Sequence, residues 1–318
     1  MALSRRGFIV TAGGGLLAST LPAWSRETEA LRGPAFGASW MLVAPAGAAA
    51  AVAPALEEIV ASVDAAMSPF RADSELSRFN RSGETGWQPL SAETCAVAGE
   101  GLRVAALTGD AFNPTVGPLV ARYGFGPIGR GAAGSPAEIA VRDGAARKAR
   151  PDLSLDLCGI AKGHALGRMV AACEAHGLCD FLIELGGEVS ARGRHPAGRA
   201  WQVGIEARGA VRRVAVLDGT ALATSGDAVN AFSYHGRRYA HIIDPATGLP
   251  ADTPLASVTI AAASAMTADA LATALFAMGA DRGPAFARSN GIEALFVVAE
   301  KGGMRESATG GFEARLLA

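Results

Sequence analysis

The sequence predicts an α+β fold in which a few long helices accompany mostly antiparallel strands. In the second half of the chain, most strand candidates are separated by hairpin-length turns rather than by crossover helices. Long helical patterns occur at only a few places. Half of the 318 residues are hydrophobic and 19% are charged, so the chain can bury a large core and is not intrinsically disordered.

Helices are predicted where apolar side chains recur at helical spacing. Residues 56–67 form the first helix, which ends because Pro69 cannot continue it. Residues 92–107 form the next, with Ser91 as its N-cap and Gly109 just after its last turn.

Two more helices are predicted in the second half of the chain. One has Leu166 and Val170 on its apolar face and is closed by Gly177. The other covers residues 267–278 and stops at Gly279.

Strands are predicted where short apolar runs lie between turn residues. They cover residues 36–43, 153–157, 181–185, 201–207, 211–217, 239–243, 257–261 and 294–299. Residues 73–80 are predicted as a loop or short helix. Pro and Gly brace residues 112–119 into a turn that no regular element could contain, and residues 124–134 form a glycine-rich loop.

The overall charge excludes some kinds of partner. Lys and Arg total 29 against 30 Asp and Glu, so the chain has no electrostatic footprint for nucleic acid or an anionic membrane. The four cysteines lack CxxC spacing, which argues against a zinc site or a redox pair. We expect mainly buried free thiols. One or two disulfides in an exported product are an alternative that the sequence leaves open.

Residues 1–25 are predicted to be a cleavable export signal. Arg5 and Arg6 precede Phe8, and a modest apolar stretch with three consecutive glycines follows. This start resembles a twin-arginine signal, which predicts a periplasmic product. A membrane anchor is the alternative, but the three glycines lower its hydrophobicity, so we do not expect an integral membrane protein.

Asp269 and Thr273 are candidates for binding a hard cation. They are four residues apart on a predicted helix, so their oxygen atoms lie on one face. Oxygen ligands of this kind suit magnesium, which usually keeps water or phosphate in its coordination shell. The alternative is an acid that offsets the helix dipole and a threonine bonded to its own turn.

Three further segments are candidates for binding a ligand. In residues 156–163, Gly159, Lys162 and Gly163 resemble a phosphate-cradling turn, although an ordinary turn with a solvated lysine would look the same. Residues 186–188 are a tight turn or a close approach to a ligand. His241, at the start of an apolar strand, is either a general base or a structural histidine.

Read in order along the chain, seven motifs resemble the FAD:protein FMN transferases, the ApbE family. They lie at residues 67–80, 112–119, 156–163, 186–188, 223–227, 241–245 and 268–273. The similarity spans residues 36–298. Each motif is weak alone, but all seven occur in the family's order, so the sequence is identified as a member of the family.

The resemblance implies a T-fold-like α+β domain over residues 26–318 that binds FAD and magnesium. It implies that the FMN half of FAD is attached through a phosphoester to a Thr or Ser of an acceptor protein, an electron-transfer protein, with release of AMP. Such a step needs charge neutralisation, in-line positioning and a base. Two alternatives stay open: hydrolysis of FAD to FMN and AMP at the same site, and a non-catalytic flavin carrier.

The resemblance also assigns residues. Asp269 and Thr273 match the family's metal-ligating side chains, and the Gly159 carbonyl is a further ligand. His241 occupies the position that we expect to act as base toward the acceptor hydroxyl. The remaining matches bind or line the FAD site: Phe36, Phe70, Ala111, Phe112, Asn113, Asp156, Lys162 and Ile243.

The sequence departs from the family pattern at several of these places. Phe70 lacks the hydroxyl of the common Tyr, and Asn113 replaces a frequent Asp. Ala272 replaces an acid that some members have before the metal threonine, which predicts weaker magnesium affinity. Cys158 and His164 replace common Gly and Tyr.

Overall fold

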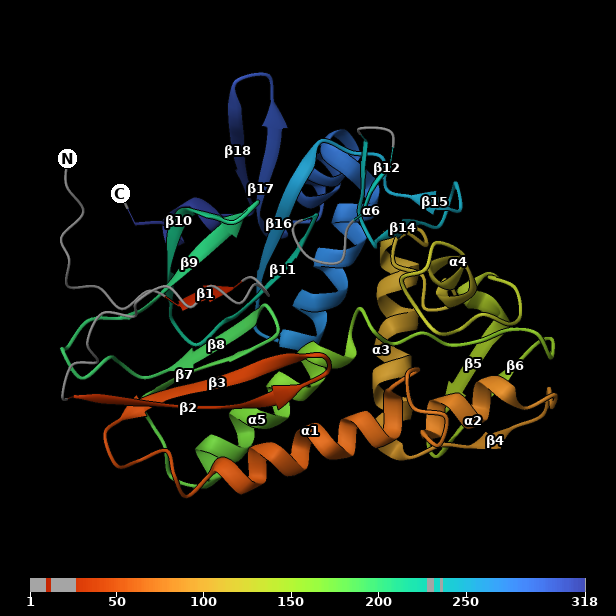
Figure 1. Ribbon diagram of the computed structural model, residues 1–318, viewed down its shortest axis with the longest axis horizontal. Coiled ribbons are helices and arrows are strands. Elements are labelled where there is room, and N and C mark those ends of the chain that lie inside the picture. Colours follow the sequence, from red (N-terminus) through yellow and green to blue (C-terminus); the bar gives the residue numbers. More distant parts are fainter. Residues whose placement is uncertain (1–9, 13–26, 228–231, 235–236, 318) are drawn as a thin grey trace.

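A computed structural model describes residues 10–12, 27–227, 232–234 and 237–317. Its centre is a sheet in which every neighbouring pair of strands is antiparallel (Figure 1). Across the sheet the strands are β18 (Gly303–Thr309), β17 (Glu293–Glu300), β16 (Leu255–Ala262), β11 (Ala221–Gly226), β8 (Glu188–Arg192), β7 (Phe181–Leu185), β3 (Ala38–Pro45) and β2 (Thr28–Ala35).

Helices cover one face of this sheet, with α1 and α5 along its β2–β3–β7 half (Figure 1). The helices are α1 (Ala53–Met67), α2 (Glu75–Arg81), α3 (Ala92–Thr108), α4 (Gly117–Arg122), α5 (Ala161–Ala175) and α6 (Ala265–Ser289). Short 3-10 helices occupy Pro136–Glu138 and Phe312–Arg315.

The central sheet is buried on both faces. In β3, Leu42 packs in the core beneath the helices, whereas Met41 and Val43 pack in a second core with Trp201 and Val203. This alternation follows the two-residue period of a strand. The second core lies under a small sheet of β1 (Val10–Ala12), β9 (Trp201–Ala207) and β10 (Ala210–Leu217).

Three smaller sheets complete the fold. Beside α3, the strands follow the order β4 (Gln88–Pro89), β6 (Ala145–Lys148) and β5 (Ile139–Arg142). Two hairpins precede β16, and they consist of β12 (Phe232–Tyr234) with β13 (Arg237–Tyr239) and β14 (Ile243–Asp244) with β15 (Leu249–Pro250). The predicted α+β class with mostly antiparallel strands is confirmed.

Local signals located the long helices correctly. Ser91 Oγ accepts a hydrogen bond from Thr94 N at 3.1 Å, so Ser91 caps α3, and Gly109 follows its end with a left-handed φ of 59°. Gly177 has a φ of 81° after α5. Gly279 interrupts α6 with φ 81° and ψ −176°, but helical structure resumes and reaches Ser289, so the predicted stop is a kink.

The first predicted strand, residues 36–43, is wrong at its start. Phe36 and Gly37 form the two-residue turn of the β2–β3 hairpin, with φ of 49° and 76°. The preceding strand β2 was not predicted because Gly33 and Pro34 are unlike strand residues. Trp40 covers that glycine, since a Cβ there would lie 2.4 Å from the indole nitrogen.

The strand predicted at residues 153–157 is absent from the structure of that segment, although its leucines are buried. Its backbone binds side chains instead of a neighbouring strand. Asn80 accepts from Leu155 N at 2.7 Å and donates to Leu155 O at 2.8 Å. Lys148, itself fully buried, donates to Leu153 O at 3.0 Å. The segment is therefore fixed by side chains rather than by pairing with a neighbouring strand.

Other predictions need smaller corrections. The turn at residues 112–119 contains the start of α4, because Pro118 fits a first helical turn. The strand predicted at residues 239–243 is divided between β13 and β14. All four cysteines are free, but Cys158 and Cys179 are exposed rather than buried.

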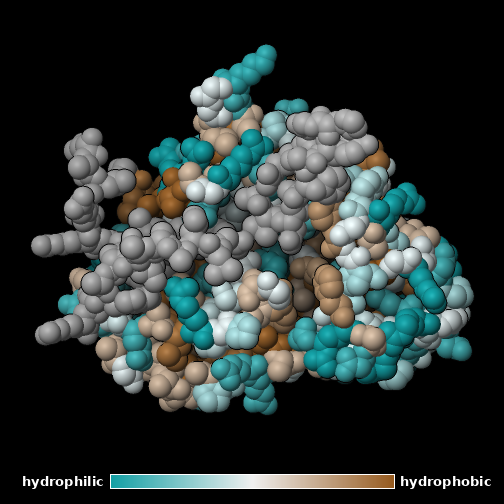
Figure 2. Space-filling model, in the orientation of Figure 1, coloured by the Kyte–Doolittle hydropathy of each residue, from teal (hydrophilic) through white to brown (hydrophobic). Residues whose placement is uncertain are grey.

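The predicted export signal, residues 1–25, lies outside the described residues except for β1. Within the described part of the chain, every helix is too short or too polar to span a bilayer. On the face seen in Figure 2, hydrophilic and hydrophobic residues are interspersed.

Candidate active site

Three charged side chains meet where α5, β8 and α6 begin. Lys162 Nζ forms an ion pair with the Glu188 carboxylate and lies 4.0 Å from Asp269 Oδ1. The side chains of Glu188 and Asp269 are 1% and 5% exposed, whereas that of Lys162 is 32% exposed. The cluster is therefore closed on its carboxylate side and open on its lysine side.

A glycine at position 163 permits this arrangement. A Cβ there would lie 2.3 Å from the carbonyl oxygen of Ala265 and 2.8 Å from Met266 Cα, so only glycine allows the first turns of α5 and α6 to touch. Through this contact Gly163 N donates a hydrogen bond to Asp269 Oδ2 at 3.0 Å. One carboxylate oxygen is thereby fixed, and Oδ1 is left facing Lys162.

The predicted metal ligands lie next to this cluster. Asp269 and Thr273 are one turn apart on α6, and a Cβ added to Gly159 would lie 3.2 Å from Thr273 Oγ1. The Gly159 backbone therefore lies against the threonine hydroxyl, and Ser225 Oγ is 3.5 Å from the same hydroxyl. A carboxylate, a hydroxyl and a carbonyl are oxygen donors of the kind that Mg²⁺ accepts, so these residues fit the ion.

This donor set contains a single carboxylate. Among the described residues, no group of three or more His, Cys, Asp or Glu side chains is arranged to hold a metal ion. Substrate phosphate or water would have to complete an octahedral shell, which is usual for Mg²⁺. Phe112, which is buried, lies 3.2 Å from the same added Cβ at Gly159 and closes that side.

Burial strongly affects the ionisable groups around the cluster. It raises the pKa of Glu188 and of Glu184, the latter to about 7, although the charge of Lys162 opposes both shifts. Burial opposes the charge on Lys162, but Asp269 and Glu188 outweigh it and raise the lysine pKa.

Glu184→Gln should flatten the pH dependence of stability. Its pKa is about 7 in the folded protein against 4.5 ordinarily, so the folded state holds this proton more tightly. The resulting stabilisation is complete below pH 4.5 and is lost as pH rises through 7. Between these limits, the wild type should lose about 3 kcal/mol of unfolding free energy relative to the variant. Urea denaturation at several pH values measures this, and equal pH slopes would contradict it.

A pocket of about 250 Å³ opens farther along α6, beside the end of α3. Ala111 and Asn113, both predicted to line the FAD site, form part of its wall together with Asp244 and Arg282. The predicted Ile243 immediately precedes Asp244 and is buried. Two of the predicted segments, around residues 111–113 and 241–245, therefore converge at this pocket.

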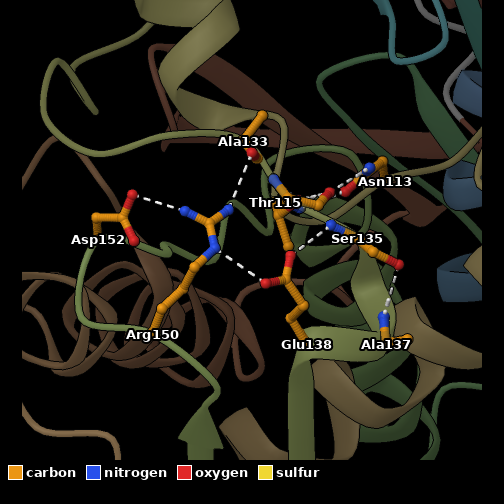
Figure 3. Close-up of polar contacts among 9 residues, drawn as sticks. Asn113, Thr115, Ala133, Ser135, Ala137, Glu138, Arg150 and Asp152 are labelled. Carbon is orange, nitrogen blue, oxygen red and sulfur yellow. Dashed lines mark hydrogen bonds and ion pairs between the residues drawn. The ribbon is translucent and has the colours of Figure 1, made fainter.

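Asn113 braces the loop that borders the pocket (Figure 3). Its Oδ1 accepts from Thr115 N at 2.8 Å and from Thr115 Oγ1 at 2.7 Å, while its Nδ2 donates to Gly134 O at 3.1 Å. Beside it, Arg150 forms ion pairs with Glu138 and Asp152. An aspartate at position 113 could not donate to Gly134, which gives this departure from the family pattern a structural reason.

The other predicted residues lie on surrounding segments. Asp156 Oδ1 accepts a hydrogen bond from Cys158 N at 3.0 Å. Phe36 lies in the β2–β3 turn, and Phe70 is 69% exposed between α1 and α2. His241 meets the ring of Phe125 edge-on, with centroids 6.3 Å apart. The roles of all these residues stay predictions.

Sequence reasoning missed the pairing of Lys162 with Glu188 and the nearby burial of Glu184. The available signal was Glu184, a lone acid within the apolar run of β7. Glu188 was noticed only as the end of a glycine turn. Nothing in the sequence pointed to Arg282 at the pocket.

The fold and the cluster define an α+β protein whose polar site is built from two helix N-termini and a hairpin of the central sheet. Comparison with family models then identifies the family. The model described as ApbE family matches residues 36–296, and the chain belongs to that family.

Similar proteins agree in sequence and in structure. The FAD:protein FMN transferase of Vibrio cholerae is 35% identical over 275 residues, which is 81% of this chain and 82% of the relative. That of Haemophilus influenzae is 33% identical over 281 residues, 81% of either chain. The solved structure titled Flavin Transferase ApbE from Vibrio cholerae superposes with a TM-score of 0.83 at 32% identity and covers 91% of this chain and 99% of that one.

Proposed function

We propose that the protein transfers the FMN half of FAD to a Thr or Ser hydroxyl of an acceptor protein and releases AMP. Its relatives are named FAD:protein FMN transferases, and membership of their family supports an enzyme of the transferase class. The observation that carries the chemistry is the cluster of Lys162 and Asp269 beside Gly159 and Thr273. We further propose that residues 1–25 direct export to the periplasm, where the acceptor would reside.

The charges of the site support a requirement for a cation. Glu188 and Asp269 are buried acids, and Lys162 is the cation that contacts them. A diphosphate would add negative charge, so positive charge is needed to bind it. Asp269 Oδ1, Thr273 Oγ1 and the Gly159 carbonyl would hold Mg²⁺, which when bound supplies that charge. Lys162, open on one side, binds a phosphate oxygen.

The reaction forms a phosphoester bond and breaks the phosphoanhydride bond of FAD. The acceptor oxygen forms a bond to the FMN-side phosphorus, and the bond from that phosphorus to the bridging oxygen breaks. The bridging oxygen leaves with AMP. His241 takes the proton of the acceptor hydroxyl. The pocket lined by Ala111 and Asn113 holds a part of FAD away from this centre.

One incubation separates this function from its alternatives. Purified protein is mixed with FAD, Mg²⁺ and a threonine-bearing acceptor, and the products are analysed by mass spectrometry and chromatography. We expect the acceptor to gain the mass of FMN while AMP appears. Free FMN with AMP would indicate a hydrolase, and unchanged FAD would indicate a carrier.

His241→Ala should lower the transfer rate by about 10²- to 10⁴-fold, the usual contribution of a general base. Binding of FAD, measured by flavin fluorescence, should be nearly unchanged. His176→Ala is the matched control, because His176 is exposed at the end of α5. Full transfer activity in the His241 variant would overturn the assignment of the base.

A further inference from the structure

Lys162 lies between two buried carboxylates and forms its ion pair with Glu188, which the proposed reaction does not use. We infer that Glu188 is a positioning residue that holds the Lys162 ammonium away from Asp269, and thereby keeps Asp269 Oδ1 available to the metal ion. The inference rests on the proposed function, because it concerns the metal-binding part of the same site.

The oxygen atoms of Asp269 have different partners. Oδ2 accepts the hydrogen bond from Gly163 N, so it is committed to the contact between α5 and α6. Oδ1 is the oxygen that faces Lys162 Nζ, at 4.0 Å. That distance is long for a hydrogen bond, yet short enough for strong attraction in a buried site. A small movement of the ammonium would occupy the oxygen that the metal ion needs.

Glu188 opposes this movement. It is the first residue of β8, and its carboxylate is buried where the β7–β8 hairpin meets α5. Its Oε2 has no hydrogen-bond partner among the residues that the structure describes. A buried carboxylate with so few partners depends on its ion pair, so the pair with Lys162 is costly to break.

The hairpin also restricts the lysine stem. A Cβ added to Gly186 would lie 3.6 Å from Lys162 Cδ, so the turn passes close beneath the side chain. With the stem in contact there, the ammonium has two acidic neighbours, and Glu188 holds it. Without the charge of Glu188, Asp269 becomes the stronger attraction, and lysine and metal ion compete for Oδ1.

A general loss of negative charge must be separated from this specific effect. Glu184 provides the matched control, because it is a neighbouring acid on β7 whose pKa also responds to Lys162. Its Oε1 accepts a hydrogen bond from Gly187 N rather than pairing with the lysine. At a pH above 7, where the Glu184 carboxyl is ionised, Glu184→Gln therefore removes one nearby negative charge while leaving the lysine in place.

The test measures Mg²⁺ binding to the full chain without FAD, by calorimetry and by the Mg²⁺-dependent rise in melting temperature. We expect Glu188→Gln to weaken Mg²⁺ binding by about tenfold, which is typical when a group supporting a metal ligand is removed. Glu184→Gln should change it far less. Adding Lys162→Met to the Glu188 variant should return the affinity to that of Lys162→Met alone, because the competing ammonium is gone.

A merely structural role predicts a different pattern. Wild-type affinity in Glu188→Gln, or failure of Lys162→Met to correct it, would overturn the inference. If Glu188→Gln does not fold, Glu188→Asp keeps the charge but shortens its reach, and the same correction is expected. If the wild type does not bind Mg²⁺, or if Asp269→Asn leaves its Mg²⁺ binding intact, the proposed metal site is refuted, and the inference with it.

Discussion

Asp269→Asn is expected to lower FMN transfer by about 10³-fold, the size seen when a group that stabilises developing charge is removed from a preorganised site. Asparagine has nearly the same volume and can still accept the hydrogen bond from Gly163 N. It removes the carboxylate charge next to Thr273 and Lys162, and with it the anionic ligand of the proposed metal site. Initial rates at several Mg²⁺ concentrations measure the effect, and excess Mg²⁺ should restore little of it.

Asp281→Asn is the control for this experiment. Asp281 is an exposed acid on the same helix, beyond the kink at Gly279, and its loss should leave the rate unchanged. Undiminished transfer by Asp269→Asn would refute the assigned centre. Equal loss in both variants would show that the rate responds only to the overall charge of α6.

Gly163→Ala is expected to destabilise the fold by about 3 kcal/mol or more. Overpacking substitutions destabilise most when the added group meets backbone atoms that cannot move away. The added Cβ would lie 2.3 Å from a carbonyl oxygen and 2.8 Å from Met266 Cα, and neither backbone atom can rotate away. Separation of α5 from α6 would also withdraw Gly163 N from Asp269. Urea denaturation and FMN-transfer assays should therefore both show a loss.

Gly167→Ala provides the opposite expectation on the same helix. Gly167 is exposed in α5, and nothing lies within 4 Å of an added Cβ. Alanine should stabilise the protein by up to about 1 kcal/mol, because glycine is a poor helix former. Similar unfolding curves for the two variants would contradict the close contact at Gly163.

Local chemistry explains what the sequence predicted correctly. Ser91 and Gly109 mark the ends of α3 through contacts within a few residues, and these contacts form in the structure. The spacing of Asp269 and Thr273 required only that the segment be helical. Family membership was identified from the order of motifs, none of which is decisive by itself.

Errors arose where distant residues decide the local structure. Leucines alternate in residues 153–157 as they would in a strand, but Asn80 supplies the hydrogen bonds that a neighbouring strand would have made. Strand β2 exists because β3 pairs with it and Trp40 covers Gly33. The ion pair of Lys162 with Glu188 depends on how the β7–β8 hairpin meets α5, which sequence spacing cannot specify.

The attachment of residues 153–157 to Asn80 and Lys148 links the reactive centre to a distant part of the molecule. The segment leads directly into Gly159, and its backbone is hydrogen-bonded by side chains from α2 and β6. Local opening of that peripheral region would release the approach to the Gly159 carbonyl, a proposed metal ligand, before the central sheet unfolds. Opening of the small sheet would therefore disturb the proposed site while the central sheet stays folded.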